Sequence, residues 1–439
     1  MIAGVATVLA SAFAAPAAMA ADPVSVPAEP QHPRPTGRAI VFSNRPATAS
    51  AAIHRLELDT QTAIPELGAV AVNPPGGEGV GAVRRALRRE PGVAAVEPEY
   101  RRFVRLAPDD PAFSAADPRA PFGDVYQWNL RQQGFARGWE LSTGRRAKLA
   151  VIDTGVDGGN PDLGPRIVAA VDHDPTPGQG PATVDENGHG THVSGLACAT
   201  GNNGYGGASP GFACELIVEK SDLTDASIAD SMVDATKRGA DVINMSFGGP
   251  GRSKVIADAV KFAWKRDVIM VAAASNRNSK RQGIPAELLQ PKESGPKLEK
   301  GKGLVVTAAG YDGSRAWFRP GHGKGISVAA TGAATRTTPG IFSNFPANLT
   351  QLDTGVAFRE PPCGCRTSFE GDDRFAYLDG TSMAAPQVAG AAALIRSRKP
   401  KIGAKKVIRK IKKKARGSNF RGSVGWGLLD AAAALRGVD

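Results

Sequence analysis

The sequence predicts an α/β protein with a mostly parallel central sheet and helices on both faces, preceded by a small α+β domain. Two observations lead to this prediction. Between residues 147 and 330, short apolar runs alternate with stretches of helical spacing, as in parallel sheets that are covered on both faces. Before residue 104, several short strand-like runs surround a single amphipathic helix. A chain of 439 residues is long enough for both parts.

The first residues have the pattern of an exported protein. Residues 1–20 combine an apolar stretch with Ala18-Met19-Ala20, a small-x-small cleavage site typical of a secretory signal peptide. A membrane anchor is the alternative, but the apolar stretch is short and contains Pro16. Residues 21–37 are Pro-rich and polar, which predicts a disordered spacer. We therefore expect a secreted protein, either extracellular or periplasmic.

Residues 38–105 are predicted to form the small α+β domain. The helix has Val83 and Leu87 on one face and arginines on the other. We expect strands at 39–42, 53–58, 68–72 and 92–100 and a helix at 80–89.

Residues 106–439 are predicted to form the α/β domain. The run from Gln387 to Leu394 is nearly all Ala, Gly and Val, so the helix that carries it must be buried on every face. We expect strands at 147–153, 216–218, 242–249, 268–276, 304–309 and 326–330, and a further helix at 228–237.

Three polar residues lie where such a fold builds sites. Asp153 ends an apolar strand, His189 stands between two glycines before a small-residue helix, and Ser382 begins the buried helix. A helix start offers free N–H groups that stabilise an anion. Each residue alone is more often structural, as a capping Ser, a turn Asp or a buried His. We expect His189 to be catalytic and His192 to be structural.

The segments around these residues carry a resemblance. Asp153-Thr154-Gly155, the run from His189 to Gly195, and Gly380-Thr381-Ser382-Met383-Ala384-Ala385-Pro386 occur in the order Asp, His, Ser. This order with these flanks resembles the subtilisin-like serine proteases, the subtilases. The resemblance covers residues 108–439 and implies a subtilisin-like fold. It also implies a serine endopeptidase that forms an acyl-enzyme.

The resemblance assigns chemical roles to four residues. Ser382 would be the nucleophile, His189 the base that takes and returns its proton, and Asp153 the group that orients the imidazole. Asn276 matches the family's side-chain donor to the oxyanion hole, although this chain has Ser275 where the family more often has Gly. In isolation, Asn276 would be read as a turn residue.

Two further segments resemble the family's substrate site. The run Ser246, Phe247 and Gly248 resembles the edge that pairs with an extended peptide. Gly283 resembles the floor of the P1 pocket, which would leave room for a large apolar side chain. Ordinary strand and turn are the alternatives for both segments. We expect protein or peptide substrates, broad specificity and a monomer.

Residues 38–105 resemble the family's inhibitory propeptide, most clearly from Val96 to Tyr100. The resemblance implies a precursor that cuts itself between Arg102 and Asp109 and keeps the freed propeptide as an intramolecular inhibitor.

A structural calcium ion is also implied by the resemblance. Asp162, the loop at 201–206 with Asn202, and Asp110 match the family's calcium site, and oxygen-rich loops suit a hard cation. Plain turns are the alternative. No organic cofactor is expected.

The four cysteines predict disulfides in an exported chain. Cys198 and Cys214 flank a Gly-rich loop and can pair. Cys363 and Cys365 form a Cys-Gly-Cys sequence, where a disulfide would close a tight ring. No His lies near them in the sequence, which favours a disulfide over a zinc site.

The charge of the chain is concentrated in one segment. The net charge is +12, and residues 396–416 contain twelve Lys or Arg and no Asp or Glu, so the rest of the chain is formally neutral. No specific binding of nucleic acid by the whole protein follows. An apolar stripe at helical spacing runs through this segment. It indicates either a docked helix or, as an alternative function, a surface that binds membranes or anionic polymers. The stripe consists of Ala404, Val407, Ile408, Ile411 and Ala415.

Overall fold

The computed structural model describes two compact units, residues 1–103 and 104–439. The described residues are 35–438, except 75–78, 101–107, 175–178, 291–296, 299–300, 356–360 and 418. The predicted signal peptide, nearly all of the predicted spacer and most of the predicted cleavage region lie outside them. Within this described part, no helix is both long enough and apolar enough to cross a membrane.

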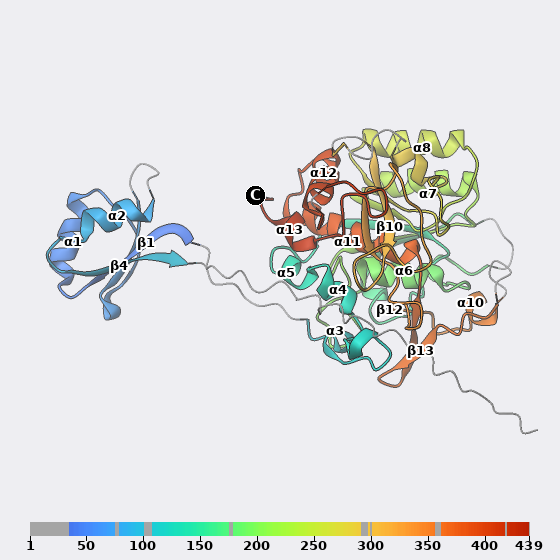
Figure 1. Ribbon diagram of the computed structural model, residues 1–439, viewed down its shortest axis with the longest axis horizontal. Coiled ribbons are helices and arrows are strands. Elements are labelled where there is room, and N and C mark those ends of the chain that lie inside the picture. Colours follow the sequence, from blue (N-terminus) through green and yellow to red (C-terminus); the bar gives the residue numbers. More distant parts are fainter. Residues whose placement is uncertain are drawn as a thin grey trace, which may run out of the picture. The chain divides into compact units, whose positions relative to one another are not determined.

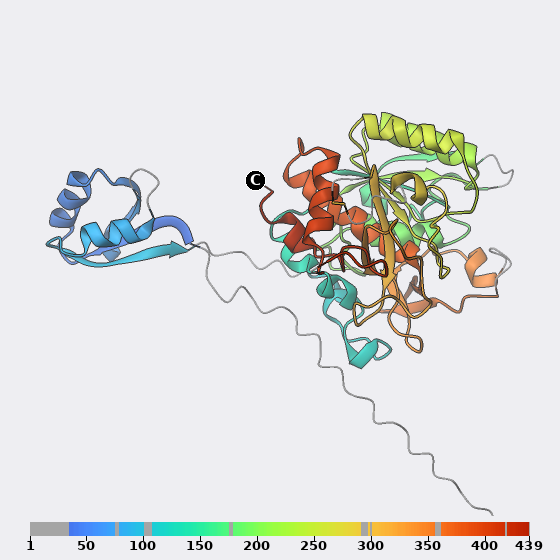
Figure 2. The ribbon, with the colours of Figure 1, turned by 45° about the horizontal axis from the view of Figure 1, so that its top comes forward.

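The first unit is a small antiparallel sheet with two helices. The strands pair in the order β2-β3-β1-β4. Figure 2 shows the two helices on one side of this sheet, where Ile53, Val83 and Leu87 join a shared core with Val41 and Val72. Its elements are β1 (Pro35–Ser43), α1 (Pro46–Arg55), β2 (Asp59–Ile64), β3 (Ala69–Asn73), α2 (Val80–Leu87) and β4 (Val93–Tyr100).

The strand predicted at residues 53–58 is wrong. Residues up to Arg55 belong to helix α1, which has Pro46 in its first turn and buries Ala49, Ala52 and Ile53. These three positions share one face at helical spacing. Six residues of alternating polarity do not distinguish a strand from the end of a helix.

The second unit is built around a parallel sheet, which confirms the predicted fold class. Its strand order is β11-β10-β9-β8-β5-β7-β6, and all neighbours are parallel. The strands are β5 (Lys148–Asp153), β6 (Ile167–Asp172), β7 (Glu215–Lys220), β8 (Val242–Met245), β9 (Ile269–Ala273), β10 (Gly303–Ala309) and β11 (Val328–Thr331).

Both faces of this sheet are buried. Along β5, Leu149 and Val151 belong to one hydrophobic cluster, while Ala150 and Ile152 belong to another. The first cluster includes residues of α6 (His189–Cys198) and α11 (Thr381–Arg398). The second includes residues of α7 (Asp225–Lys237) and α8 (Lys254–Lys265). Figure 1 shows this unit, with β10 labelled in the sheet and α7, α8 and α11 among its helices. The alternation of side chains along a strand therefore separates two helical layers.

Short elements complete the second unit. An antiparallel sheet in the order β12-β14-β13 packs beside α6. Its strands are β12 (Ile341–Asn344), β13 (Arg366–Phe369) and β14 (Asp372–Leu378). The remaining helices are α3 (Pro111–Ser114), α4 (Trp128–Gln132), α5 (Phe135–Trp139), α9 (Ala286–Leu289), α10 (Gln351–Thr354), α12 (Ala404–Lys414) and α13 (Ala431–Leu435).

The basic segment forms the predicted helix α12. All five residues of its apolar stripe are buried in the main core, with exposed fractions between 0% and 7%. Lys412 is also buried, while Lys405, Lys406, Lys413 and Lys414 are exposed. The stripe is therefore used for docking within the protein, as the docked-helix alternative predicts.

The order of the strands places a site at one end of the sheet. From β5 the chain continues to β6 and β7 on one side and to β8 through β11 on the other. Ligands bind at the carboxyl ends of parallel strands where the order reverses in this way. Predicted strands 242–249 and 268–276 end earlier, at Met245 and Ala273, so their last residues form loops at this end.

Candidate active site

Asp153 ends strand β5 at this end of the sheet. Its side chain is buried, with 2% exposed, and Oδ1 accepts hydrogen bonds from the Thr154 N–H at 2.9 Å and from His189 Nδ1 at 2.7 Å. The structure thus brings together two of the three residues predicted to be catalytic. Since Nδ1 donates to Asp153, Nε2 is left as the basic nitrogen.

Glycines bring the imidazole close to the strand end. His189 begins helix α6 after Gly188, which has φ 98°. A Cβ at Gly190 would lie 2.2 Å from the Gly155 carbonyl oxygen, so only glycine fits there. The His189 side chain remains 21% exposed. The flanking glycines therefore serve the close approach of the helix to the loop after Asp153.

Asp185 fixes both loops and was not predicted. It is fully buried, and its carboxylate accepts bonds from the Thr154 hydroxyl at 2.9 Å and from the N–H groups of Gly188 at 2.9 Å and Thr191 at 2.8 Å. The contact with Thr154 joins the end of β5 to the start of α6. The available sequence signal was an Asp just before a Gly-His pair at a helix start, the kind of position where side chains cap free N–H groups.

The surrounding charges raise the pKa of His189. Burial of the ring acts to lower this pKa, but the charge and hydrogen bond of Asp153, together with the charge of Asp185, outweigh it. The imidazolium form is therefore stabilised, as required of a base that must hold a proton during a reaction.

Ser382 lies in the first turn of α11, the helix that packs against α6. Its hydroxyl donates to the Ser246 carbonyl oxygen at 2.7 Å, and the Ser246 hydroxyl donates back to the Ser382 carbonyl oxygen at 2.9 Å. Among the described contacts, the Ser382 hydroxyl is thus bonded to Ser246 and not to His189. A change of the Ser382 side-chain rotamer would redirect the hydroxyl.

Asn276 follows β9 and contacts the same helix start. Its side-chain oxygen Oδ1 accepts the Thr381 N–H at 2.9 Å and lies 2.8 Å from the Thr381 hydroxyl. That hydroxyl also lies 2.6 Å from the Ala274 carbonyl oxygen. Since Thr381 holds the amide oxygen, the NH₂ group is the free end of Asn276. Thr381 was not predicted, because its role depends on a residue 105 positions away.

The two predicted substrate segments lie side by side. The Gly249 N–H donates to the Ile284 carbonyl oxygen at 3.1 Å, and the Ile284 N–H donates back at 2.8 Å. Ser246 is buried, Phe247 is partly buried and Gly248 is exposed. Gly283 has φ 78°, and a Cβ there would lie 2.7 Å from the Gly249 carbonyl oxygen. The close approach of these two backbones therefore requires a glycine at position 283.

The comparisons with known proteins agree with one another. A sequence profile described as the subtilase family matches residues 144–427. The alkaline protease of Alkalihalobacillus alcalophilus is 30% identical over 348 residues, which are 76% of this chain and 78% of that protein. Thermitase of Thermoactinomyces vulgaris is 28% identical over 288 residues, 64% of this chain and 85% of that protein.

Solved structures show the same likeness. A protease from Pseudoalteromonas arctica PAMC 21717 has a TM-score of 0.60 and 27% identity, covering 76% of this chain and 99% of that one. The chain belongs to the subtilase family. It is therefore a serine endopeptidase, a hydrolase whose substrates are peptides and proteins.

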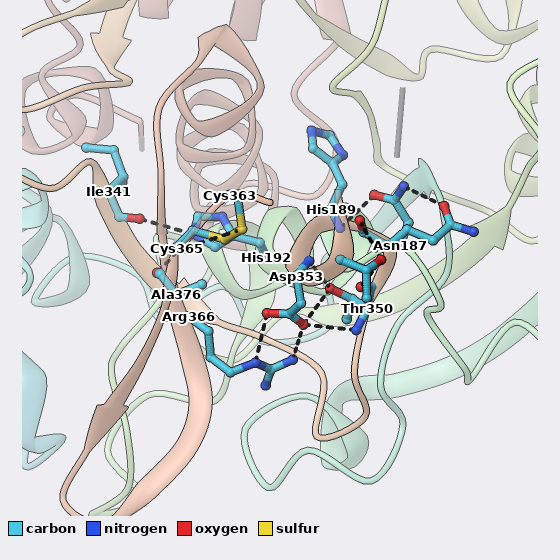
Figure 3. Close-up of a disulfide and its surroundings, with 12 residues drawn as sticks. Asn187, His189, His192, Ile341, Thr350, Asp353, Cys363, Cys365, Arg366 and Ala376 are labelled. Carbon is cyan, nitrogen blue, oxygen red and sulfur yellow. Dashed lines mark hydrogen bonds and ion pairs between the residues drawn. A yellow bond between two sulfur atoms is a disulfide. The ribbon is translucent and has the colours of Figure 1, made fainter. Parts of the chain in front are cut away.

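The second histidine of this subtilase is buried in the protein interior. His192 Nε2 lies 3.0 Å from the Ile341 carbonyl oxygen and 3.2 Å from that of Ala376 (Figure 3). Burial lowers the pKa of His192 to about 3. The ring is therefore neutral and joins α6 to β12 and β14, in the structural position predicted for it.

Two of the three predicted calcium residues, Asp110 and Asp162, are buried beside the 201–206 loop. The carboxylate of Asp110 accepts the N–H groups of Asn202 at 2.7 Å and Asn203 at 3.3 Å. The carboxylate of Asp162 accepts the side-chain amides of Asn203 and Asn344, each at 2.9 Å. Burial, with the Asp110 charge adding to it, raises the pKa of Asp162 to about 7. Two buried carboxylates beside one loop are a donor set that fits calcium.

One predicted ligand is placed differently from the other two. Asn202 is an exposed residue, and its described contact with Asp110 is through its backbone N–H. Asn203, which was not predicted as a ligand, is the loop residue whose side chain reaches Asp162.

Both predicted disulfides are present. Cys198 pairs with Cys214, with Cα atoms 5.7 Å apart, and Cys363 pairs with Cys365, with Cα atoms 5.0 Å apart. Figure 3 shows the second disulfide, which directly precedes Arg366 in the chain, and the ion pair between Arg366 and Asp353.

Proposed function

We propose that this serine endopeptidase works through Asp153, His189 and Ser382 and is made as a precursor that processes itself. The observation that carries the proposal is the 2.7 Å bond between His189 Nδ1 and Asp153, next to a helix whose first turn holds Ser382. The raised pKa of His189 adds to it.

The first half of the reaction follows from these positions. Ser382 Oγ attacks the carbonyl carbon of the scissile bond while His189 Nε2 takes the hydroxyl proton. Asp153 stays ionised and stabilises the imidazolium. The negative charge on the carbonyl oxygen is stabilised by the free NH₂ group of Asn276 and the N–H of Ser382 at the helix start. His189 then gives its proton to the leaving amine, and an acyl-enzyme remains.

Water completes the reaction. His189 takes a proton from water, whose oxygen attacks the acyl carbon, and returns that proton to Ser382 Oγ as the acid product leaves. Atoms and protons balance over the two halves, with one water consumed for each peptide bond.

The substrate would bind as an extended strand along Ser246, Phe247 and Gly248. The exposed backbone of Gly248 supports this, as does the adjoining segment at Gly283, which would form the opposite wall. We propose a preference for large apolar P1 side chains. Gly283 itself is a poor position at which to test it, because a side chain there would meet the Gly249 backbone.

The remaining parts of the proposal concern the precursor. Residues 38–105 would be the inhibitory propeptide, a role that suits the separately folded first unit. Residues 1–20 would direct export to the periplasm or the medium. Asp110 and Asp162 would hold a structural calcium ion, with oxygens of the 201–206 loop completing its shell.

The test is covalent labelling. A fluorophosphonate reacts with an activated serine, so the mature protein should gain one label, and peptide mapping should place it on Ser382. His189→Ala should reduce the labelling rate by several orders of magnitude, because the hydroxyl loses its base. Labelling at another serine, or equal labelling of His189→Ala, would contradict the proposed mechanism.

A further inference from the structure

Another histidine, His173, lies among carboxylates on the other side of the central sheet. His173 follows strand β6, Glu219 lies on β7, and Asp234 lies on helix α7. One possible ligand atom from each of the three residues lies within 4.8 Å of the others. Three elements far apart in sequence therefore bring an imidazole and two carboxylates to one point.

The centre of this cluster is shielded from water. The side chain of His173 is 7% exposed and that of Glu219 is 0% exposed. Glu219 Oε2 lies 2.6 Å from His173 Nε2, but Glu219 Oε1 has no hydrogen-bond partner among the described residues. A buried carboxylate oxygen without a partner is costly, so each such oxygen calls for an explanation. A bound cation supplies one.

The imidazole is oriented as in metal sites. His173 Nδ1 lies 2.9 Å from Asp230 Oδ2, one turn before Asp234 on α7. A carboxylate that accepts the Nδ1 proton fixes the tautomer and turns the Nε2 lone pair toward the metal. Here Nε2 then faces Glu219 Oε2 at 2.6 Å, a hydrogen-bond distance, and a metal ion bound by both atoms would replace the proton between them and hold them about 3.4 Å apart.

The charge in the cluster also favours a divalent cation. Three carboxylates, those of Glu219, Asp230 and Asp234, surround the imidazole, whereas the cation Arg238 is paired with Asp234. Glu219 Oε1 is the buried oxygen of this group that has no partner among the described residues.

We propose that His173 Nε2, Glu219 and Asp234 bind a divalent transition-metal ion of the zinc class, with Asp230 as the outer partner of the imidazole. Nitrogen and oxygen ligands bind zinc at about 2.0–2.2 Å, so tetrahedral ligands lie about 3.4 Å apart. The atoms of the cluster that lie farthest apart would therefore have to approach by up to about 1.4 Å, and His173 Nε2 and Glu219 Oε2 would have to separate by about 0.8 Å. Water would take the fourth position, and the ion would fasten edge strand β6 to β7 and α7.

This site is separate from the active site. Glu219 points to the face of the sheet that α7 covers, together with Ile217. Lys220, the next residue, pairs with Asp153 in the sheet and reaches Glu186 on the opposite face. A metal ion at His173 should therefore act on the stability of the fold and leave turnover unchanged.

The test is zinc binding by the full chain carrying His189→Ala. This substitution prevents self-cleavage and removes the imidazole of the triad as a competing ligand. With excess calcium present, titration calorimetry with Zn²⁺ should find one site, and zinc should raise the melting temperature. Co²⁺ in place of Zn²⁺ should give visible absorption typical of a tetrahedral site.

Single substitutions at the cluster decide the assignment. Glu219→Gln should abolish the zinc site, Asp234→Asn should weaken it at least tenfold, and Asp230→Asn should weaken it by about 10–100-fold. Asp258→Asn, at an exposed carboxylate of α8, should change nothing. Because Asp234 is only partly buried, its variant serves even where Glu219→Gln fails to fold. Absence of zinc binding, or affinities within twofold of the parent in these variants, would overturn the proposal.

Discussion

This subtilase contains two imidazoles with closely similar partners on Nδ1. His189 Nδ1 lies 2.7 Å from Asp153, and His173 Nδ1 lies 2.9 Å from Asp230. The pKa of each ring is raised. At His189, burial opposes the shift and the charge and hydrogen bond of Asp153 prevail, whereas at His173 the hydrogen bond that the ring donates to Glu219 is the largest cause. A carboxylate on Nδ1 therefore does not by itself identify a catalytic base.

The two imidazoles, those of His189 and His173, differ in the surroundings of Nε2. His189 is 21% exposed and begins a helix that packs against the helix of Ser382. His173 is 7% exposed, and its Nε2 faces a buried carboxylate. One ring is thus open to a substrate and the other is closed by ligand-type oxygens. The group that faces Nε2, and its access to solvent, separate a proton carrier from a cation site.

The largest effect is expected for Ser382→Ala. Loss of the nucleophile should lower kcat by about 10⁶-fold, the loss known for a subtilisin. If the chain processes itself, the variant should accumulate as a folded precursor that keeps residues 38–105. Intact mass in a host without other secreted proteases measures this, with Ser368→Ala, at an exposed residue of β13, as the control. Normal maturation of Ser382→Ala would assign the cut to another enzyme.

A paired substitution tests the comparison directly. Asp153→Asn should lower kcat by about 10⁴-fold, because an amide stabilises the wrong imidazole tautomer. Asp230→Asn makes the same change at the other imidazole and should leave kcat/KM within twofold. Steady-state kinetics on one peptide measures both variants. A large loss of activity in Asp230→Asn would mean that the two regions are coupled.

Asn276→Ala should have a smaller effect on the rate. Loss of the corresponding donor in a subtilisin lowers kcat by about 10²–10³-fold. KM should change little, because the NH₂ group acts on charge that develops in the transition state. Thr381→Val, which removes a contact to the amide oxygen and keeps the donor, should cost less. An unchanged kcat in Asn276→Ala would remove this residue from the oxyanion hole.

Removal of calcium should lower stability without stopping the chemistry directly. An ion at 100 times its dissociation constant stabilises the native state by about 2.7 kcal/mol, which excess EGTA would remove. The melting temperature of the Ser382→Ala chain measures this shift, and Asp162→Asn should abolish the response. The zinc site at His173 should be unaffected by Asp162→Asn. Equal melting curves with and without chelator would exclude the calcium site.

The smallest effect concerns pH. Since the pKa of His189 is raised above 6.5, kcat/KM should increase with pH through a pKa above that value, as the base becomes neutral. The contribution of His189 to the stability of the folded protein changes with pH in the opposite direction. It is fully present below pH 6.5 and is lost as the pH rises through the folded-state pKa. Activity profiles and urea unfolding of the Ser382→Ala chain measure the two effects. An activity limb below pH 6.5 would contradict the shift.

The sequence was sufficient to predict an element when the pattern that identifies it lies within that element. The buried helix α11 follows from a run of small residues, and Asp153 and His189 were singled out by the family resemblance of the segments that flank them, since their places at a strand end and a helix start were not sufficient alone. Strand β6 was not predicted, although residues 167–171 are all apolar; it is an edge strand whose residues alternate between partly buried and exposed.

Groups that need partners from several elements could not be predicted in this way. Asp185 contacts Thr154, and Thr381 contacts Asn276, across 31 and 105 positions. The cluster at His173 combines the residue after β6 with residues from β7 and α7, and none of them has a local motif. Such contacts depend on the packing of the elements, which short patterns in the sequence do not contain.

The disulfide between Cys198 and Cys214 has a consequence for where the enzyme becomes active. Cys198 ends the helix that His189 begins, and Cys214 directly precedes the strand that pairs with Asp153. The bond turns the intervening segment, which holds Asn202 and Asn203, into a closed ring with few open conformations left to lose. The loop then loses less conformational entropy when it binds an ion. The disulfide and a bound calcium ion would thus order the same loop. A chain that is still in a reducing compartment with little calcium would have neither.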